Sequence, residues 1–289
     1  MSKNQMNSYE KIRELIKDVE GYLSFQEAVF LYNTAKNVKN GVIVEIGAYK
    51  GLSTICLGLG SKERNKVKVF SVDPHKWDNT KEDFLKNIKK YKVDDVVIPV
   101  YKKSCEFVNE FKRSISFLFI DGDHRKNAVE NDFIYWFPKV EEGGIMSIHD
   151  VTNFPGPKEI AIQYICKTKN FSNVGLVDSL IYGQKSRKGK LHLNLVDIIE
   201  SKYQKYKLMN SVFLDKKKVK LKDNKLIILP EKRIFKLTSE QLQIIKLFDG
   251  QHTFYEIVEK LSLPFPVIKN LFDTLHKSKV AFYNYECRK

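Results

Sequence analysis

The sequence lacks several features that define large classes of proteins. It has no run of about 18 or more apolar residues, which is roughly the shortest length for a helix across a membrane. Its first residues contain no apolar secretory segment. Its four cysteines are scattered, without a Cys-x-x-Cys pair, so neither a disulfide framework nor a cysteine zinc site is expected. We therefore expect a cytoplasmic protein with reduced thiols and no membrane partner.

Acidic residues are scarce in one part of the chain only. Residues 1–184 contain 27 Lys and Arg against 24 Asp and Glu, whereas residues 185–289 contain 23 against 11. Most of the net charge of +15 therefore belongs to the last third. A basic block of this kind is typical of a solvated surface, and it is equally suited to dock nucleic acid or an acidic peptide.

The main glycine motif does not have the Gly-x-Gly-x-x-Gly spacing of dinucleotide-binding proteins. A buried strand is predicted over residues 42–46, followed by Gly47, Gly51 and a helix with Ser53 in its first turn. A glycine turn between strand and helix directs backbone N–H groups and a positive helix end at a ligand. Glu45, two residues before the first glycine, favours a ligand with a cationic amino group over a pyrophosphate.

Polar residues also follow the other predicted strands. The strand over residues 66–73 ends at Asp73, and an acid at that place can bind both hydroxyls of a ribose. A short strand over residues 95–101 precedes Ser104, near where an adenine edge would lie. His75 and Trp77 are expected to pack over the adenine.

Two further strands, residues 114–121 and 145–148, are each followed by acids and histidines. The first ends at Asp121 with His124 shortly after it, and the second is followed by His149 and Asp150. Strands that alternate with helices predict an α/β fold, a Rossmann-like doubly wound and mostly parallel sheet. Ligands bind at the carboxyl ends of such strands, so all these side chains are expected at one edge.

Taken together, these motifs resemble the class I S-adenosylmethionine (SAM) dependent methyltransferases, in the group that includes macrolide-sugar and cephalosporin O-methyltransferases. The resemblance covers roughly residues 8–184. It implies SAM as the cofactor, while apolar residues at helical spacing predict helices in the N-terminal region before the sheet. The cofactor-binding residues that we predict are Glu45, Gly47, Gly51, Ser53, Asp73, Ser104 and Asp121.

The resemblance also implies a divalent cation in several relatives. Acids after the fourth and fifth strands hold it there, a role that would fall to Asp121 and Asp150, and carboxylates with waters suit Mg²⁺. Those relatives carry an acid before the last aspartate, whereas this chain has His149. This difference leaves the requirement for Mg²⁺ open.

Methyl transfer from a sulfonium needs alignment of donor and acceptor and removal of a proton from the acceptor. His124 and His149, with Asp121 beside them, are the candidates for the catalytic base. The alternative for each histidine is a structural hydrogen bond to a neighbouring carboxylate.

The last third predicts a separate small unit. The predicted divisions are a methyltransferase domain over residues 1–184, a basic helical connector over 185–215 and an α+β winged-helix domain over 216–289. Residues 247–261 resemble the PqqD-like domains, which hold leader peptides in peptide-modifying pathways. The resemblance therefore implies a leader peptide as a partner, and the surplus of lysines favours an acidic one.

Three functions remain open from the sequence. The first is an O-methyltransferase that acts on a ribosomally made peptide or on a small-molecule or sugar acceptor in natural-product biosynthesis. The second is a nucleic-acid binder or methyltransferase, which we do not favour because Asp-Gly-Asp-His stands where a base methyltransferase often has Asn/Asp-Pro-Pro-Tyr/Phe. The third, an NAD(P) oxidoreductase, is disfavoured by the glycine spacing. A homo-oligomer is also left open.

Overall fold

A computed structural model describes residues 3–76, 79–214, 217–222, 225–229, 233–263, 265–278 and 280–283. The chain divides into two compact units, and the division falls within one long helix, α8 (Leu193–Asn210). The first unit contains residues 1–152 and 156–198, and the second contains 153–155 and 199–289. We describe each unit separately.

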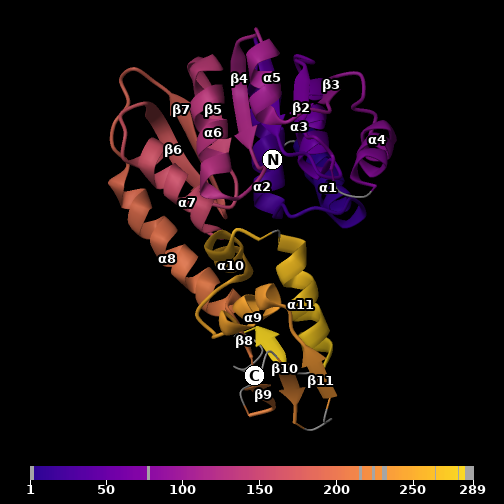
Figure 1. Ribbon diagram of the computed structural model, residues 1–289. Coiled ribbons are helices and arrows are strands. Elements are labelled where there is room, and N and C mark those ends of the chain that lie inside the picture. The colour runs from indigo at the N-terminus through magenta and orange to yellow at the C-terminus, as the bar shows by residue number, and fades with distance from the viewer. Residues whose placement is uncertain are drawn as a thin grey trace. The chain divides into compact units, whose positions relative to one another are not determined.

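The first unit is built on a seven-stranded sheet with the order β3-β2-β1-β4-β5-β7-β6 (Figure 1). The first five strands are parallel, and β7 pairs antiparallel to both β5 and β6. The predicted Rossmann-like, mostly parallel sheet is therefore confirmed. The strands are β1 (Val42–Ile46), β2 (Val69–Val72), β3 (Val97–Val100), β4 (Ile115–Ile120), β5 (Val140–Ile148), β6 (Phe171–Val177) and β7 (Leu180–Lys185).

Helices cover both faces of this sheet, as the near-continuous apolar strands require. One core joins the sheet to α1 (Lys3–Asp18), α2 (Phe25–Asn37), α3 (Leu52–Glu63) and α4 (Thr80–Lys90). On the other face an aromatic cluster joins Phe70 of β2 to Phe107, Phe111 and Trp136. Phe107, Phe111 and Trp136 lie on or beside α5 (Ser104–Glu110) and α6 (Lys126–Trp136). Further along the chain, α7 (Pro155–Ile160) continues into a π-helix (Ala161–Cys166).

Two elements differ from the sequence prediction. The strand predicted from Ile145 begins at Val140 and runs through the glycine pair, because a register shift relative to β4 and a positive φ of 80° at Gly143 absorb the irregularity. The short helix α5 was not predicted. It has seven residues, too few to show a clear helical period.

The second unit is small and has α+β structure. A three-stranded antiparallel sheet has the order β11-β10-β9, and β8 pairs separately with β12. Its elements are β8 (Val212–Leu214), β9 (Val219–Lys222), β10 (Lys225–Ile228), β11 (Arg233–Lys236), α9 (Ser239–Lys246), α10 (Phe254–Leu261), α11 (Phe265–Lys277) and β12 (Ala281–Tyr283). The expected last strand over residues 280–285 lies partly outside the described residues. This unit has its own core, around Phe248, Ile257 and Phe272.

No described helix is both long enough and apolar enough to cross a membrane. Of the cysteines that the structure describes, Cys56 and Cys166 are buried thiols and Cys105 is an exposed thiol.

Candidate active site at the carboxyl edge of the sheet

The glycine loop brings the ends of β1 and β4 together. Gly47 has a φ of 87°, and a Cβ at this position would lie 2.1 Å from the carbonyl oxygen of Asp121. Gly51, with a φ of 92°, precedes α3 as its N-cap. Only glycine satisfies the close approach at residue 47 without moving the backbone. The loop that was predicted to bind the cofactor therefore lies directly beside the first predicted acceptor-side acid.

Asp73 lies at the end of β2 and is hydrogen-bonded to this loop. Its Oδ2 accepts hydrogen bonds from the backbone N–H groups of Ala48 (2.8 Å) and Tyr49 (3.0 Å). Its Oδ1 accepts one from the N–H of His75 (2.7 Å). A carboxylate has about four acceptor positions, so the contacts that fix Asp73 leave capacity for ribose hydroxyls.

Glu45 is completely buried behind the loop. Its Oε2 accepts hydrogen bonds from the hydroxyls of Thr54 (2.5 Å) and Ser71 (2.7 Å), while its Oε1 has no hydrogen-bond partner among the described residues. Burial raises the pKa of Glu45 to about 7, against hydrogen bonds from Ser53, Thr54 and Ser71. An unpaired buried acceptor is costly, and a cationic ligand near Oε1 would relieve that cost.

The other residues that were predicted to lie near the cofactor are found in different environments. Ser53 is buried in the first turn of α3. Ser104 begins α5, and its hydroxyl donates a hydrogen bond to Asp132 of α6, whose pKa is raised by burial to about 6. His75 packs against Phe84 and Tyr101, with ring centroids 5.1 and 5.7 Å away. Trp77 lies outside the described residues.

The predicted acids and histidines after β4 and β5 form one cluster. His124 Nε2 lies 2.9 Å from Asp150 Oδ2. His149 Nδ1 lies 3.2 Å from Asp121 Oδ1 and 3.3 Å from Asp150 Oδ2. The His124 side chain is 25% exposed and that of His149 is only 2% exposed, so solvent reaches the first imidazole and hardly reaches the second.

A fifth residue belongs to this cluster and was not assigned to it from the sequence. Glu27 of α2 is buried, and its Oε2 lies 3.2 Å from His149 Nε2. Its Oε1 accepts hydrogen bonds from the hydroxyl (2.6 Å) and backbone N–H (2.9 Å) of Ser179. The sequence signal at Glu27 was a capping box with Ser24, which the structure contains, and that signal gives no indication of the second contact.

The charges in the cluster stabilise one another. Burial alone would lower the pKa of His149, but Asp121 and Asp150 raise it well above its ordinary value. Burial alone would raise the pKa of Glu27, but His149 and Ser179 hold it at about 2. The pKa of Asp150 is likewise held far below its usual range, against burial, by His149 and His124.

Among the described residues, one group presents atoms that are close enough to hold a metal ion. Asp121, His124 and Asp150 each offer one ligand atom, and these atoms lie within 4.8 Å of one another. A cavity of about 10 Å³, lined by residues that include Asp121, His124 and His149, lies there. This is about the volume that one water molecule requires.

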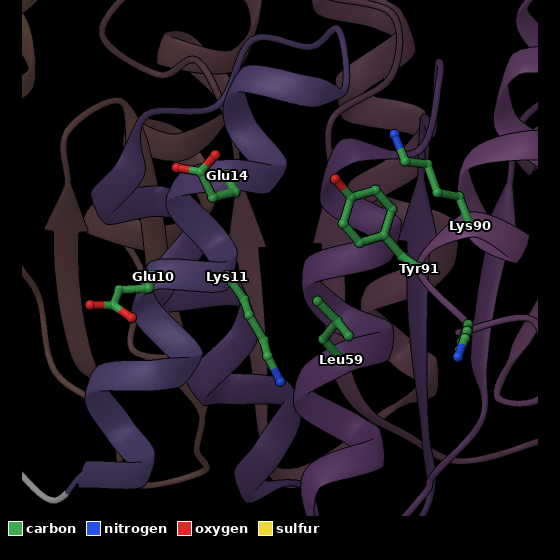
Figure 2. A pocket seen from close by; sticks show the side chains of 7 residues that line it. Glu10, Lys11, Glu14, Leu59, Lys90 and Tyr91 are labelled. Atoms are coloured by element: carbon green, nitrogen blue, oxygen red, sulfur yellow. The ribbon is translucent and has the colours of Figure 1, made fainter.

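A larger hollow lies away from this cluster. It has a volume of about 430 Å³ and is lined by side chains of α1, α3 and the end of α4 with the loop after it (Figure 2). None of the predicted site residues lines it. The lining residues are Glu10, Lys11, Glu14, Leu59, Lys90, Tyr91 and Lys92.

Comparison with known proteins supports a methyltransferase domain. Residues 44–151 match a protein-family model described as a methyltransferase domain. An uncharacterised protein of Acanthamoeba polyphaga mimivirus is 24% identical over 166 residues, which are 52% of this chain and 71% of that protein.

Solved structures share the fold at low sequence identity. A structural-genomics target from Corynebacterium glutamicum superposes with a TM-score of 0.50 at 12% identity, over 62% of this chain and 90% of that one. The O-methyltransferase TomG of Streptomyces achromogenes, which is involved in tomaymycin synthesis and was crystallised with SAM, has a TM-score of 0.49 at 13% identity. That similarity covers 62% of this chain and 89% of TomG.

The sheet order and the helices on both faces of the sheet define a Rossmann-like fold. Among proteins with this fold, the family match over residues 44–151 indicates a methyltransferase. Residues 44–151 therefore match a methyltransferase domain, in agreement with the predicted enzyme class.

We predict that Asp73→Ala weakens SAM binding about tenfold or more. The substitution removes a group that would form charge-assisted hydrogen bonds to the ribose, worth roughly 1.5–3 kcal/mol, and it also releases the N–H groups of Ala48 and Tyr49. Titration calorimetry measures the change. Asp95→Ala, which removes an exposed acid paired with Lys62, is the matched control and should bind SAM normally. Unchanged affinity in folded Asp73→Ala would remove the ribose assignment.

We also predict that Glu45 makes the ligand-free protein less stable as pH rises. Its pKa is about 7 in the folded state and about 4.5 as the reference value, so the folded state binds more protons between these values. The stability contribution of Glu45 is therefore complete below about pH 4.5 and is lost as pH rises through 7. Denaturant unfolding measures the free energy of unfolding of the wild type and of Glu45→Gln. The wild-type value minus the variant value should decline by roughly 3 kcal/mol over this pH range. A flat difference would contradict the assigned pKa.

Proposed function

We propose that the enzyme is an O-methyltransferase in which His124 removes the proton from an acceptor hydroxyl. The observation that supports it is the pair of His124 Nε2 and Asp150 Oδ2, 2.9 Å apart at the carboxyl edge of the sheet. The predicted cofactor loop lies next to this pair, because its residue Gly47 closely approaches the backbone of Asp121. A positioned imidazole contributes about 10²–10⁴-fold to such a step.

The pair also assigns the hydrogen positions on His124. Asp150 has a strongly lowered pKa and is therefore a carboxylate that only accepts. The hydrogen of the pair then belongs to Nε2 of His124, and Nδ1 is the nitrogen that takes the acceptor proton. Bound SAM would supply the methyl group to the acceptor oxygen and would leave as S-adenosylhomocysteine, while His124 takes the acceptor proton. His149 is the less suitable base because it is buried and has carboxylates at both nitrogens.

We predict that His124→Gln and Asp150→Asn each lower turnover by about 10²-fold or more, because each removes the oriented base. SAM affinity should stay within about twofold of the wild type. Turnover is measured as S-adenosylhomocysteine release with a panel of hydroxylated peptides, sugars and phenols, with mass spectrometry of the methylated product.

Asp123→Asn is the matched control for these variants. Asp123 lies in the same loop, but its carboxylate is paired with Arg125, so this variant should retain turnover within about threefold. Full activity in either His124→Gln or Asp150→Asn would overturn the assignment of the base. Methylation of nitrogen or carbon with no O-methyl product would overturn the reaction type.

We further propose that the second unit holds a peptide that carries the acceptor, as the PqqD-like resemblance implies. Support comes from the edge strands β9 and β11 of the three-stranded sheet. Leu221 of β9 is 42% exposed and Ile234 of β11 is 60% exposed, and exposed apolar edge strands favour the addition of another strand. Lys220 and Lys222 on β9 are also exposed and favour an acidic peptide.

We predict that the double variant Lys220→Glu/Lys222→Glu binds a panel of acidic peptides at least about tenfold more weakly, with most of the loss in the association rate. Surface plasmon resonance at low salt measures both rates. The control is Lys246→Glu/Lys277→Glu, which reverses two exposed lysines of α9 and α11 and should bind normally.

Equal binding by both variants would favour an oligomerisation or regulatory role for the second unit, with a small-molecule or sugar acceptor. Binding of DNA with a steep salt dependence would favour the nucleic-acid alternative, because phosphate contacts release counterions.

A further inference from the structure

The metal that the sequence resemblance implies does not fit the donors at this site. A cation held by Asp121 and Asp150 would lie beside His149, whose Nδ1 is 3.2 and 3.3 Å from oxygens of these two acids. Mg²⁺ prefers oxygen ligands in an octahedral arrangement and keeps several waters. Here the third available donor is the nitrogen of His124, and the adjacent cavity has room for about one water.

His149 itself has the geometry of a cation. Carboxylate oxygens are within 3.3 Å of both ring nitrogens, Asp121 and Asp150 at Nδ1 and Glu27 at Nε2. A carboxylate accepts hydrogen bonds and donates none, so both nitrogens carry hydrogen and the ring is an imidazolium. The side chains of His149 and Glu27 are 2% and 3% exposed, so water screens this charge little.

We propose that the His149 imidazolium, held by Glu27, takes the place of the divalent cation and neutralises the Asp121–Asp150 pair from inside the fold. Glu27 acts as a positioning residue, because Ser179 and the backbone N–H of Ser24 fix its carboxylate against Nε2. The imidazolium in turn holds Asp150 where it contacts His124. This inference rests on the acid pair of the proposed function, but its test needs neither an acceptor nor turnover.

The test measures Mn²⁺ binding to the whole 289-residue chain. The electron paramagnetic resonance signal of free Mn²⁺ reports how much of the ion remains unbound. The wild type should bind no more tightly than the charge-matched variant Lys139→Gln, because an imidazolium faces the acid pair in both. Lys139 lies after α6, and its ammonium group contacts the carbonyl of Phe111. Lys139→Gln removes a single positive charge, which is the same net change as in the double variant Glu27→Gln/His149→Glu, and it does not alter the acid cluster.

The informative variant is Glu27→Gln/His149→Glu. It supplies a third carboxylate beside Asp121 and Asp150, and it removes the Glu27 charge that the new carboxylate would otherwise face. This double variant should bind Mn²⁺ at least about tenfold more tightly than the wild type. His149→Gln, which removes the charge without adding a ligand, should show a smaller gain. Circular dichroism establishes that each variant is folded.

Two results would overturn the inference. One is Mn²⁺ binding by the wild type that is at least tenfold tighter than in Asp150→Asn, since the acids would then hold a cation despite His149. The other is a folded Glu27→Gln/His149→Glu protein that gains no Mn²⁺ affinity. Neither result bears on the base assignment, which is judged by turnover of His124→Gln.

Discussion

The structure depends most on the close approach of two chain segments at Gly47. The end of β1 passes so near the end of β4 that a side chain at Gly47 would overlap the Asp121 carbonyl. The N–H of Asp121 donates a hydrogen bond to the carbonyl of Ile46 (2.8 Å), which fixes the approach. Every functional group of the first unit is placed relative to this junction. The predicted cofactor loop follows β1, and the predicted acceptor-side acids follow β4 and β5.

Much of this arrangement could be predicted from the sequence, because it depends on local patterns. Apolar strands that end on Asp73, Asp121 and Asp150 can be recognised individually, and the rules of parallel sheets bring their ends to one edge. The seven-stranded order β3-β2-β1-β4-β5-β7-β6 agrees with that expectation. The assignment of single residues to SAM or to the base remains a prediction.

The rest could not be predicted, since it depends on contacts between distant residues. Glu27 and His149 are separated by more than a hundred positions, and each has a sufficient local explanation, as a helix cap and as a strand-end histidine. The pairing of Ser104 with Asp132 across α5 and α6 is of the same kind. A single sequence shows which residue types are present. It does not show which buried acid contacts which buried base.

The double use of Glu27 has a consequence for how the protein opens. One carboxylate caps α2 through the N–H of Ser24 (2.8 Å), accepts the N–H of Ser179 (2.9 Å) and contacts His149. Fraying of the first turn of α2 would therefore expose a buried imidazolium and the segment between β6 and β7 in the same event. Segments that are far apart in the chain then form one cooperative unit. The amide hydrogens of Ser24 and Ser179 should exchange with solvent at a common, slow rate, although both lie at the ends of their elements.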